Sequence, residues 1–445
     1  MTGRRVRAPV GDDAVALGAP GAPGAPSATQ GVSRRRFLAG AASLTGATIV
    51  GGALGYAGAL ALNPRGLEAG VGGPDQIVPF RGLRQAGIAT PAPSRLAIAA
   101  FDVTGASRAD LAALLQTWTS AAALMAAGEP VGDPTAAPLA PAVDTGEAVG
   151  LLPANLTVTI GFGPSLFDGR FGLASRRPAA LADIPALPGD FLDPAISNGD
   201  IVIQACSDDP QVSFHAVRNL ARLGRGTAVV RWFQLGFGRT SKTSSAQETP
   251  RNLQGFKDGT NNVLAEQADD MDRFVWVGAE RDQDWMRGGS YMVTRRIRML
   301  VEAWDRAGFQ DQQNVIGRRK ISGAPLGATA EHDTVDLAAA GPDGTPLIPA
   351  DAHIRLAAPS NHGGLRILRR GYSFTDGIDP VTGQLDAGLF FICFQKDPRA
   401  QFVPIQRTLG AQDALNEYIR HVSSGVFACP PGLVPGEWWG QRLLG

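Results

Sequence analysis

The order in which the hydrophobic pattern changes between residues 95 and 235 limits the possible folds more than any other feature of this sequence. Residues 96–104 (LAIAAFDVT) alternate, include β-branched residues and predict a strand. Residues 110–127 place large apolar residues at spacings of three and four, which predicts a helix, and Asp110 suits its start. Further strands are predicted at 156–162, 200–206 and 228–235, with a helix at 211–223. The resulting order, β-α-β-β-α-β, predicts a ferredoxin-like unit.

After residue 290 the same order is repeated less regularly. Strands are predicted at 290–299, 371–375, 389–395 and 425–429, and helices at 300–307 and 412–421. The strand at 389–395 (LFFICFQ) is apolar enough to be buried on both faces. The sequence therefore predicts an α+β protein with two ferredoxin-like domains and antiparallel sheets, residues 63–245 and 246–445. The domains join near residues 240–250, where Thr, Ser and Lys cluster.

Residues 1–62 have the features of an N-terminal tail with an export signal. A Gly-, Ala- and Pro-rich stretch leads to Ser33-Arg34-Arg35-Arg36-Phe37-Leu38 and then to an uncharged segment that ends near Leu62. Paired arginines before a weakly apolar segment indicate twin-arginine export, with an uncleaved membrane anchor as the alternative. Ala59-Leu60-Ala61 fits a cleavage site. We therefore expect a periplasmic or extracellular protein that has no stable membrane insertion once the signal is removed.

Composition and missing motifs argue against several classes of protein. The 41 Lys and Arg residues equal the 41 Asp and Glu residues in number, so the chain lacks the basic excess of a nucleic-acid binder. Cys206, Cys393 and Cys429 form no CxxC pair, which leaves zinc and iron–sulfur sites without ligands. Cys206 and Cys393 lie in apolar runs and are expected in the core rather than in a disulfide. No HExxH, GxSxG, P-loop or dinucleotide-binding motif occurs.

The most distinctive stretch is residues 249–262 (TPRNLQGFKDGTNN), in which Gly255 and Gly259 bracket Asp258. Glycines at such positions let the backbone approach a flat or bulky group closely. On composition alone, a turn or a fragment of a calcium loop is a more common identity for DGTNN than a catalytic site. The spacing does not match an EF-hand loop.

Four motifs, in order along the chain, resemble those of the dye-decolorizing (DyP-type) haem peroxidases. They are GxxDG at 255–259, DAHIRLAAP at 351–359 followed by LRRGY at 368–372, LFFICFQKDP at 389–398, and LNEY at 415–418. The resemblance covers roughly residues 76–445 and implies a pair of ferredoxin-like domains, which the hydrophobic pattern predicts separately. It also implies one haem b per chain, held mainly by the C-terminal half.

The resemblance implies that His353 is the proximal ligand of the haem iron. The iron of a b-type haem needs a strong axial donor, and a neutral imidazole supplies one. Taken alone, a histidine in an apolar HIRLAA run is more often a structural residue. The nearby alternative, His362, lies in a SNHGG loop that is ill suited to holding a ligand. Glu417 is the candidate acceptor for the other ring N–H of His353, with a solvated helical glutamate as the alternative.

The resemblance also implies that Asp258 and Arg369 lie on the distal side of the haem, where peroxide binds. A carboxylate within reach can carry a proton from one peroxide oxygen to the other. Because a carboxylate stays a working base at lower pH than a histidine, we expect an acidic activity optimum. Arg369 would stabilise the negative charge on the departing oxygen. On a strand Arg370 would point to the opposite face, toward a haem propionate or solvent.

Other residues are assigned to the haem pocket by their positions in the motifs. Leu389 and Phe391 share one face of a strand and are expected to cover the distal side, with plain core packing as the alternative. Arg355 is expected to pair with a propionate. Gly255 and Gly259 are expected to let the backbone lie against the haem.

The function implied is that of a peroxidase that reduces hydrogen peroxide through a ferryl intermediate and oxidises dyes, phenols or other small one-electron donors. Tyr372, Tyr418 and Trp438 are candidates for a surface site at which bulky donors react. One alternative is an exported deferrochelatase-like protein that releases iron from haem. Another is a haem-binding protein without catalysis. We expect no nucleic-acid partner, and a homo-oligomer is compatible with the sequence.

Overall fold

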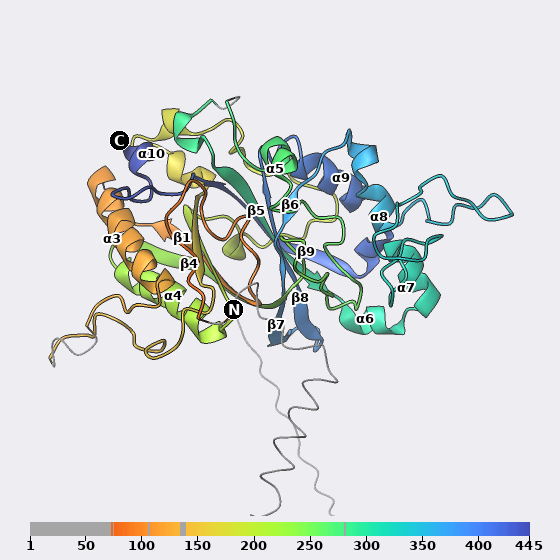
Figure 1. Ribbon diagram of the computed structural model, residues 1–445, viewed down its shortest axis with the longest axis horizontal. Helices are drawn as coiled ribbons and strands as arrows, with labels where there is room; N and C mark the ends of the chain where they lie inside the picture. Colours follow the sequence, from red (N-terminus) through yellow and green to blue (C-terminus); the bar gives the residue numbers. More distant parts are fainter. Residues whose placement is uncertain (1–72, 74, 106, 134–138, 280–281) are drawn as a thin grey trace, which may run out of the picture. The chain divides into compact units, whose positions relative to one another are not determined.

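The computed structural model describes residues 73, 75–105, 107–133, 139–279 and 282–445 (Figure 1). All of them belong to the unit Ala69–Gly445. The predicted tail and export signal, residues 1–62, lie outside the described residues. In this part of the chain no helix is long and apolar enough to cross a bilayer.

The N-terminal half has the predicted order of elements. Its elements are β1 (Arg95–Val103), α3 (Arg108–Ala126), β2 (Thr157–Phe162), β3 (Ile201–Ser207), α4 (Pro210–Leu223) and β4 (Ala228–Arg239). The strands lie in the order β4-β1-β3-β2, and all neighbours are antiparallel. Helix α3 starts two residues before the predicted start at Asp110. The Ser107 side chain caps it by accepting from the Asp110 backbone N–H, and the Asp110 carboxylate accepts from the Ser107 N–H.

The C-terminal half has a second antiparallel set, in the order β9-β5-β8-β7. Its elements are α5 (Ala268–Phe274), β5 (Ser290–Met299), α6 (Val301–Arg306), α7 (Phe309–Ile316), α8 (His353–Leu356), β6 (Leu368–Arg369), β7 (Tyr372–Ile378), β8 (Leu385–Gln395), α9 (Phe402–Gln412), β9 (Ile419–Cys429) and α10 (Gln441–Leu444).

The helix predicted at 412–421 is wrong. Helix α9 ends at Gln412, and the Asp413 carboxylate then accepts from the Leu415 N–H and begins a short 3-10 turn. Residues from Ile419 onward pair with β5, so β9 begins six residues earlier than the strand predicted at 425–429. The sheet pairing overrides the local helical pattern, as tertiary context often does.

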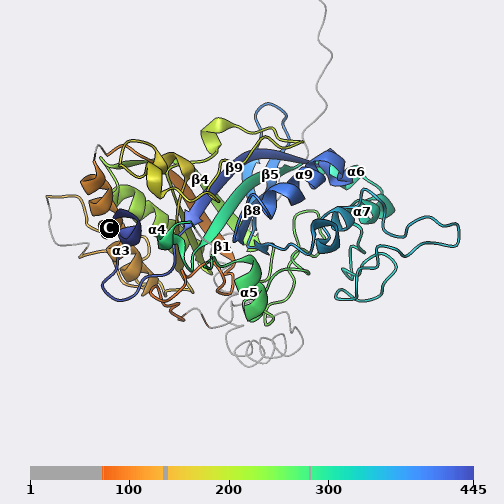
Figure 2. The ribbon, with the colours of Figure 1, turned by 90° about the horizontal axis from the view of Figure 1, so that it is seen from above.

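The two sets of strands are joined into one sheet that closes on itself into a barrel-like arrangement. Strand β4 pairs with β7 and strand β2 pairs with β9, so edge strands of one half meet edge strands of the other. Closure satisfies strand edges that would otherwise be open. The prediction of two sheets therefore needs correction to one continuous antiparallel sheet, with α3 and α4 at one end and α6, α7 and α9 at the other (Figures 1 and 2).

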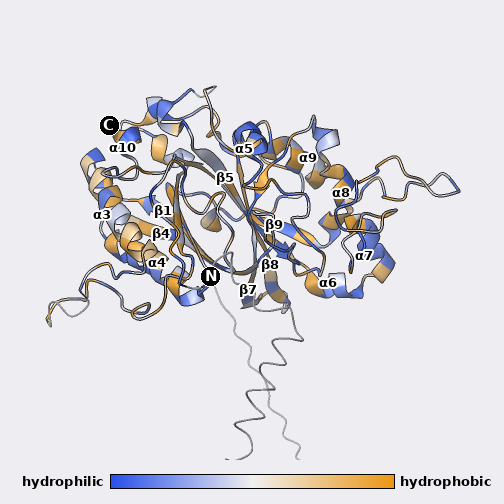
Figure 3. Cartoon of the chain, viewed as in Figure 1, coloured by the Kyte–Doolittle hydropathy of each residue, from blue (hydrophilic) through white to orange (hydrophobic). Residues whose placement is uncertain are grey.

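Apolar side chains fill both sides of this sheet. Inside it, Leu96, Ile98, Phe374, Phe390 and Phe394 form one core. On the outside, α4 packs on β1 and β3, and α3 packs on α4 and β2, around a second core. Both helices carry hydrophobic and hydrophilic residues (Figure 3), as expected of helices with one buried face. The three cysteines are buried and unpaired, which confirms the core positions predicted for Cys206 and Cys393.

Candidate active site

A cavity of about 470 Å³ opens in the C-terminal half. The outer faces of β5, β8 and β9 form one wall, α8 and α9 another, and residues 252–261 a third. Much of the lining is apolar and includes Ile297, Met299, Leu389, Phe391, Ile405 and Leu409. The four motifs quoted above contribute residues to this one space, although they are spread over about 160 residues of sequence.

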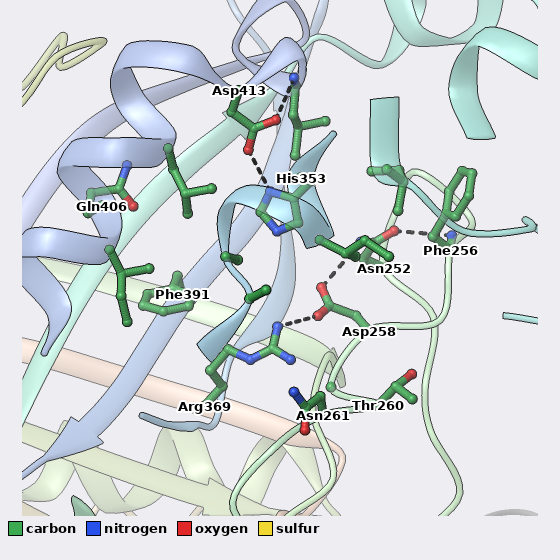
Figure 4. Close-up of a pocket in the computed structure, with 18 of the residues that line it drawn as sticks. Asn252, Phe256, Asp258, Thr260, Asn261, His353, Arg369, Phe391, Gln406 and Asp413 are labelled. Atoms are coloured by element: carbon green, nitrogen blue, oxygen red, sulfur yellow. Dashed lines mark hydrogen bonds and ion pairs between the residues drawn. The ribbon is translucent and has the colours of Figure 1, made fainter. Parts of the chain in front are cut away.

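His353 is the first residue of α8, and its half-buried ring borders the cavity. Its Nδ1 lies 2.6 Å from Oδ2 of Asp413, whose carboxylate is buried (Figure 4). A carboxylate only accepts, so Nδ1 carries the proton and Nε2 keeps a free lone pair. This is the tautomer that a metal-binding imidazole needs.

Asp413 takes the position that the sequence analysis gave to Glu417. Glu417 is the last residue of the 3-10 turn that Asp413 begins; it is exposed and does not line the cavity. The second oxygen of Asp413 accepts from the Leu415 N–H at 2.9 Å, so the backbone turn holds the carboxylate toward His353. The turn-capping position of an acid in the segment QDAL was the available signal.

Asp258 and Arg369 meet on another wall of the cavity. Oδ1 of Asp258 lies 2.8 Å from Nη1 of Arg369, and Oδ2 accepts from Nδ2 of Asn252 at 3.2 Å (Figure 4). Asn262 fixes the backbone of Arg369, accepting from its N–H at 2.8 Å and donating to its carbonyl at 2.9 Å. His353 lies between Asp413 and the Asp258–Arg369 pair (Figure 4).

Arg370 and Arg355 do not have the surroundings that the sequence analysis expected. Arg370 comes directly after β6, is wholly buried and donates to the carbonyl of Thr90, so it faces neither a propionate nor solvent. The guanidinium of Arg355 is occupied by the backbone carbonyls of Ile348 and Pro349 and does not line the cavity.

The two glycines of the GxxDG motif allow a backbone conformation and close packing against other parts of the chain, rather than contact with a ligand in the cavity. Both have left-handed φ values, +84° at Gly255 and +83° at Gly259. A Cβ on Gly255 would lie 2.7 Å from Cε of Lys320, and one on Gly259 would lie 2.7 Å from Cα of Ser241. Gly259 borders the cavity and Gly255 does not. The group they approach closely is therefore another part of the chain.

Of the remaining candidate residues, some line the cavity and others do not. Leu389 and Phe391 both line the cavity, which explains why these two positions of β8 are only partly buried. His362 lies outside the cavity lining, and its Nε2 contacts the carbonyl of Leu356 at 2.7 Å. Tyr372 is fully buried and cannot be a surface site for bulky donors.

His421, which the sequence analysis did not single out, also lines the cavity beside Gln406. Burial and the positive charge of Arg295 lower the pKa of His421 to about 3. The Nε–H of Arg295 donates to Nδ1 at 3.4 Å, which favours the neutral ring. The β5–β9 pairing places His421 opposite Ile297, two residues from Arg295.

We expect replacement of His421 by Gln to make the protein more resistant to acid. The unfolded chain takes up a proton at His421 near pH 6.5, whereas the folded chain does so only near pH 3, so stability falls as the pH drops between these values. At pH 4.5 the loss is roughly 2 to 3 kcal/mol. Acid unfolding followed by circular dichroism should show it, with His332→Gln, at an exposed histidine, as the control. Equal acid sensitivity of the wild type and His421→Gln would contradict this account.

The haem-free protein should lose stability as the pH rises through the pKa of His353. Burial by itself would lower this pKa, but the charge of Asp413 and its hydrogen bond outweigh burial and raise it above 6.5. The stabilisation is therefore complete below about pH 6.5 and is lost above the folded-state value. Urea unfolding at several pH values should reveal this dependence. Asp413→Asn should reduce the dependence of stability on pH, and Glu417→Gln should leave it unchanged. Identical pH profiles for the wild type and Asp413→Asn would overturn the assignment of Asp413 as the partner of His353.

Comparison with known proteins gives consistent matches along the chain. Residues 85–238 match the family profile described as Dyp-type peroxidase, N-terminal, and residues 249–434 match Dyp-type peroxidase, C-terminal. A relative from Escherichia coli K12, named deferrochelatase, is 39% identical over 372 residues, which are 82% of this chain and 87% of the relative.

Solved structures resemble the chain as well. An oxyferrous complex of DtpA from Streptomyces lividans is 43% identical, with a TM-score of 0.77, and the match covers 84% of this chain and 98% of DtpA. A DyP-type peroxidase from Cellulomonas bogoriensis is 40% identical, with a TM-score of 0.75, over 83% of this chain and 99% of that protein.

Proposed function

The chain belongs to the Dyp-type peroxidase family, and from this membership we propose that it is a haem-dependent peroxidase that reduces hydrogen peroxide and oxidises dyes, phenols or other one-electron donors. One observation carries the proposal. A single cavity holds an imidazole with a free Nε2, backed by a buried carboxylate, together with an Asp–Arg pair. These are the groups that peroxide cleavage at a haem requires.

The residues fit one haem b per chain. A volume of about 470 Å³ lies within the usual range of cofactor pockets, about 300 to 1,000 Å³. The walls are largely apolar, as a porphyrin needs, and the free Nε2 of His353, which lines the cavity, could bind its iron. DtpA, described as an oxyferrous complex, supports an iron cofactor. Bound haem would supply an iron that takes up peroxide and passes single electrons.

The side chains have separable roles in this proposal. His353 would hold the iron, and Asp413 would keep the proton of His353 on Nδ1 and make Nε2 a stronger donor. Asp258 accepts a proton from one oxygen of the peroxide and delivers it to the other. The Arg369 cation stabilises the negative charge on the departing oxygen. Leu389 and Phe391, which line the cavity, would shield the place where peroxide reacts and limit the entry of water.

We further propose that residues 63–245 and 246–445 are two ferredoxin-like domains, the second of which holds most of the haem. Residues 1–62 are proposed to be a tail and twin-arginine signal that directs the protein to the periplasm or the outside of the cell. A small-molecule electron donor is the expected partner besides peroxide. The partly exposed Trp438 remains a candidate surface site for bulky donors, whereas Tyr418 is buried against Trp304.

A second function is favoured by the Escherichia coli relative, whose name, deferrochelatase, indicates iron release from haem. The purified protein should be tested for both activities in parallel, by dye bleaching with peroxide and by capture of released iron with a chelator. Peroxide-dependent bleaching with no metal-free porphyrin fluorescence is the result expected of a peroxidase. Iron release that leaves an intact, fluorescent porphyrin, without dye oxidation, would replace it with the second function.

A further inference from the structure

Arg318 is a buried cation that borders the cavity without an acidic partner. It follows α7 and is 7% exposed, and its Nη1 donates to the carbonyls of Gly323 at 2.7 Å and Glu331 at 3.0 Å. Among the described residues, no carboxylate oxygen lies within 4.0 Å of its guanidinium. Its Nη2 and Nε are therefore not used in an ion pair.

The other cations bordering the cavity in the described part of the chain are all paired. Arg369 is paired with Asp258, Arg366 with Asp270, and Lys257 with Glu331. A buried charge without an ion-pair partner is unfavourable. Burial and the Arg369 cation lower the pKa of Arg318, and the charge of Glu331, which is paired with Lys257, offsets this only in part. Such a residue facing a cavity indicates that the ligand of that cavity supplies the missing negative charge.

The charges of the cavity identify the kind of group. The net positive charge of a ferric porphyrin core can be offset by Asp413, which contacts the iron ligand His353. Asp258 is already balanced by Arg369. The remaining cation, Arg318, then matches a carboxylate at the edge of the porphyrin, and a guanidinium can bind a carboxylate with two parallel hydrogen bonds.

We propose that Arg318 binds a propionate carboxylate of the haem, an inference that rests on the haem proposed above. Arg355 and Arg370, which the sequence analysis offered for this role, have their donors directed at backbone carbonyls instead. Arg318 would thereby set which edge of the porphyrin points toward the 318–331 loop. It acts in binding and orientation and takes no part in proton transfer.

The test compares iron protoporphyrin IX with its dimethyl ester, which lacks the charged carboxylates. Haem-free wild-type protein and Arg318→Met are each titrated with both compounds, and affinity is read from the Soret band and from quenching of tryptophan fluorescence. The wild type should bind the acid about tenfold to a hundredfold more tightly than the ester. Arg318→Met should lose most of this preference, and Arg318→Lys should retain part of it.

Arg366→Met is the matched control, because Arg366 borders the same cavity but is paired with Asp270. It should keep the preference of the wild type for the acid. Undiminished preference in both Arg318→Met and Arg318→Lys would overturn the inference, whereas a wild type that binds neither compound would overturn the proposed function itself. If Arg318→Met fails to fold, Arg318→Gln in the same titration decides the question.

Discussion

Asp258→Asn and Arg369→Leu are each expected to lower peroxide turnover by about a hundredfold to ten-thousandfold while the protein keeps its haem. Asn cannot carry a proton between the peroxide oxygens, and Leu removes the cation that stabilises the departing oxygen. The two side chains touch at 2.8 Å, so their effects should not add in the double variant. Stopped-flow measurement of the reaction with peroxide, alongside the Soret band, separates loss of turnover from loss of haem.

Asp376→Asn is the control for this pair. Asp376 makes an ion pair with Arg296 at the same 2.8 Å separation, but neither residue lines the cavity. Its turnover should match that of the wild type. If Asp258→Asn and Arg369→Leu also retain wild-type turnover with haem bound, the peroxidase mechanism is refuted and a non-catalytic or iron-releasing role gains support.

His353→Ala should abolish or greatly weaken the Soret band of the purified protein. Mutation of a residue that supports a metal ligand lowers metal affinity by about tenfold to a hundredfold, so loss of the proposed iron ligand itself should lower haem affinity by at least about a hundredfold. The fold should survive, because the ring is half-buried and its one hydrogen-bond partner, Asp413, is also held by the backbone of Leu415. Haem titration of the refolded variant measures the effect.

His362→Ala provides the comparison, since this nearby histidine lies outside the cavity lining. It should bind haem as the wild type does. A His353→Ala variant with a normal Soret band and normal affinity would show that another residue holds the iron. A folded wild-type protein that is colourless and cannot be reconstituted with haem would refute the haem proposal as a whole.

Local patterns were sufficient for most of the secondary structure. Strand β5 has the predicted bounds, and α3 begins within two residues of its predicted start, because alternation and helix capping depend on neighbouring residues. For the segment after Gln412, the same reasoning gave the wrong prediction. Its apolar residues fit a helix, but pairing with β5, more than a hundred residues earlier in the chain, gives a longer strand.

The candidate site shows the same division. The GxxDG stretch was visible in the sequence because it is contiguous, and its neighbour Asn252 comes from the same segment. The partner of His353 could not be predicted from the sequence, because Asp413 is 60 residues away. Glu417, only four residues further on, is chemically an equally good hydrogen-bond acceptor. A 3-10 turn rather than a helix decides which of the two acids faces the ring.

The sequence by itself determined the family resemblance, the order of strands and helices, and the residues Asp258, His353 and Arg369, since each depends on short motifs or local periodicity. The tertiary structure alone decided that the sheet is continuous, that Asp413 backs His353, and that Arg355 and Arg370 are occupied elsewhere while Arg318 is unpaired. Charged and polar groups bind the partners that the fold brings within about 3 Å. The distance between two residues in the sequence says little about whether the fold brings them that close.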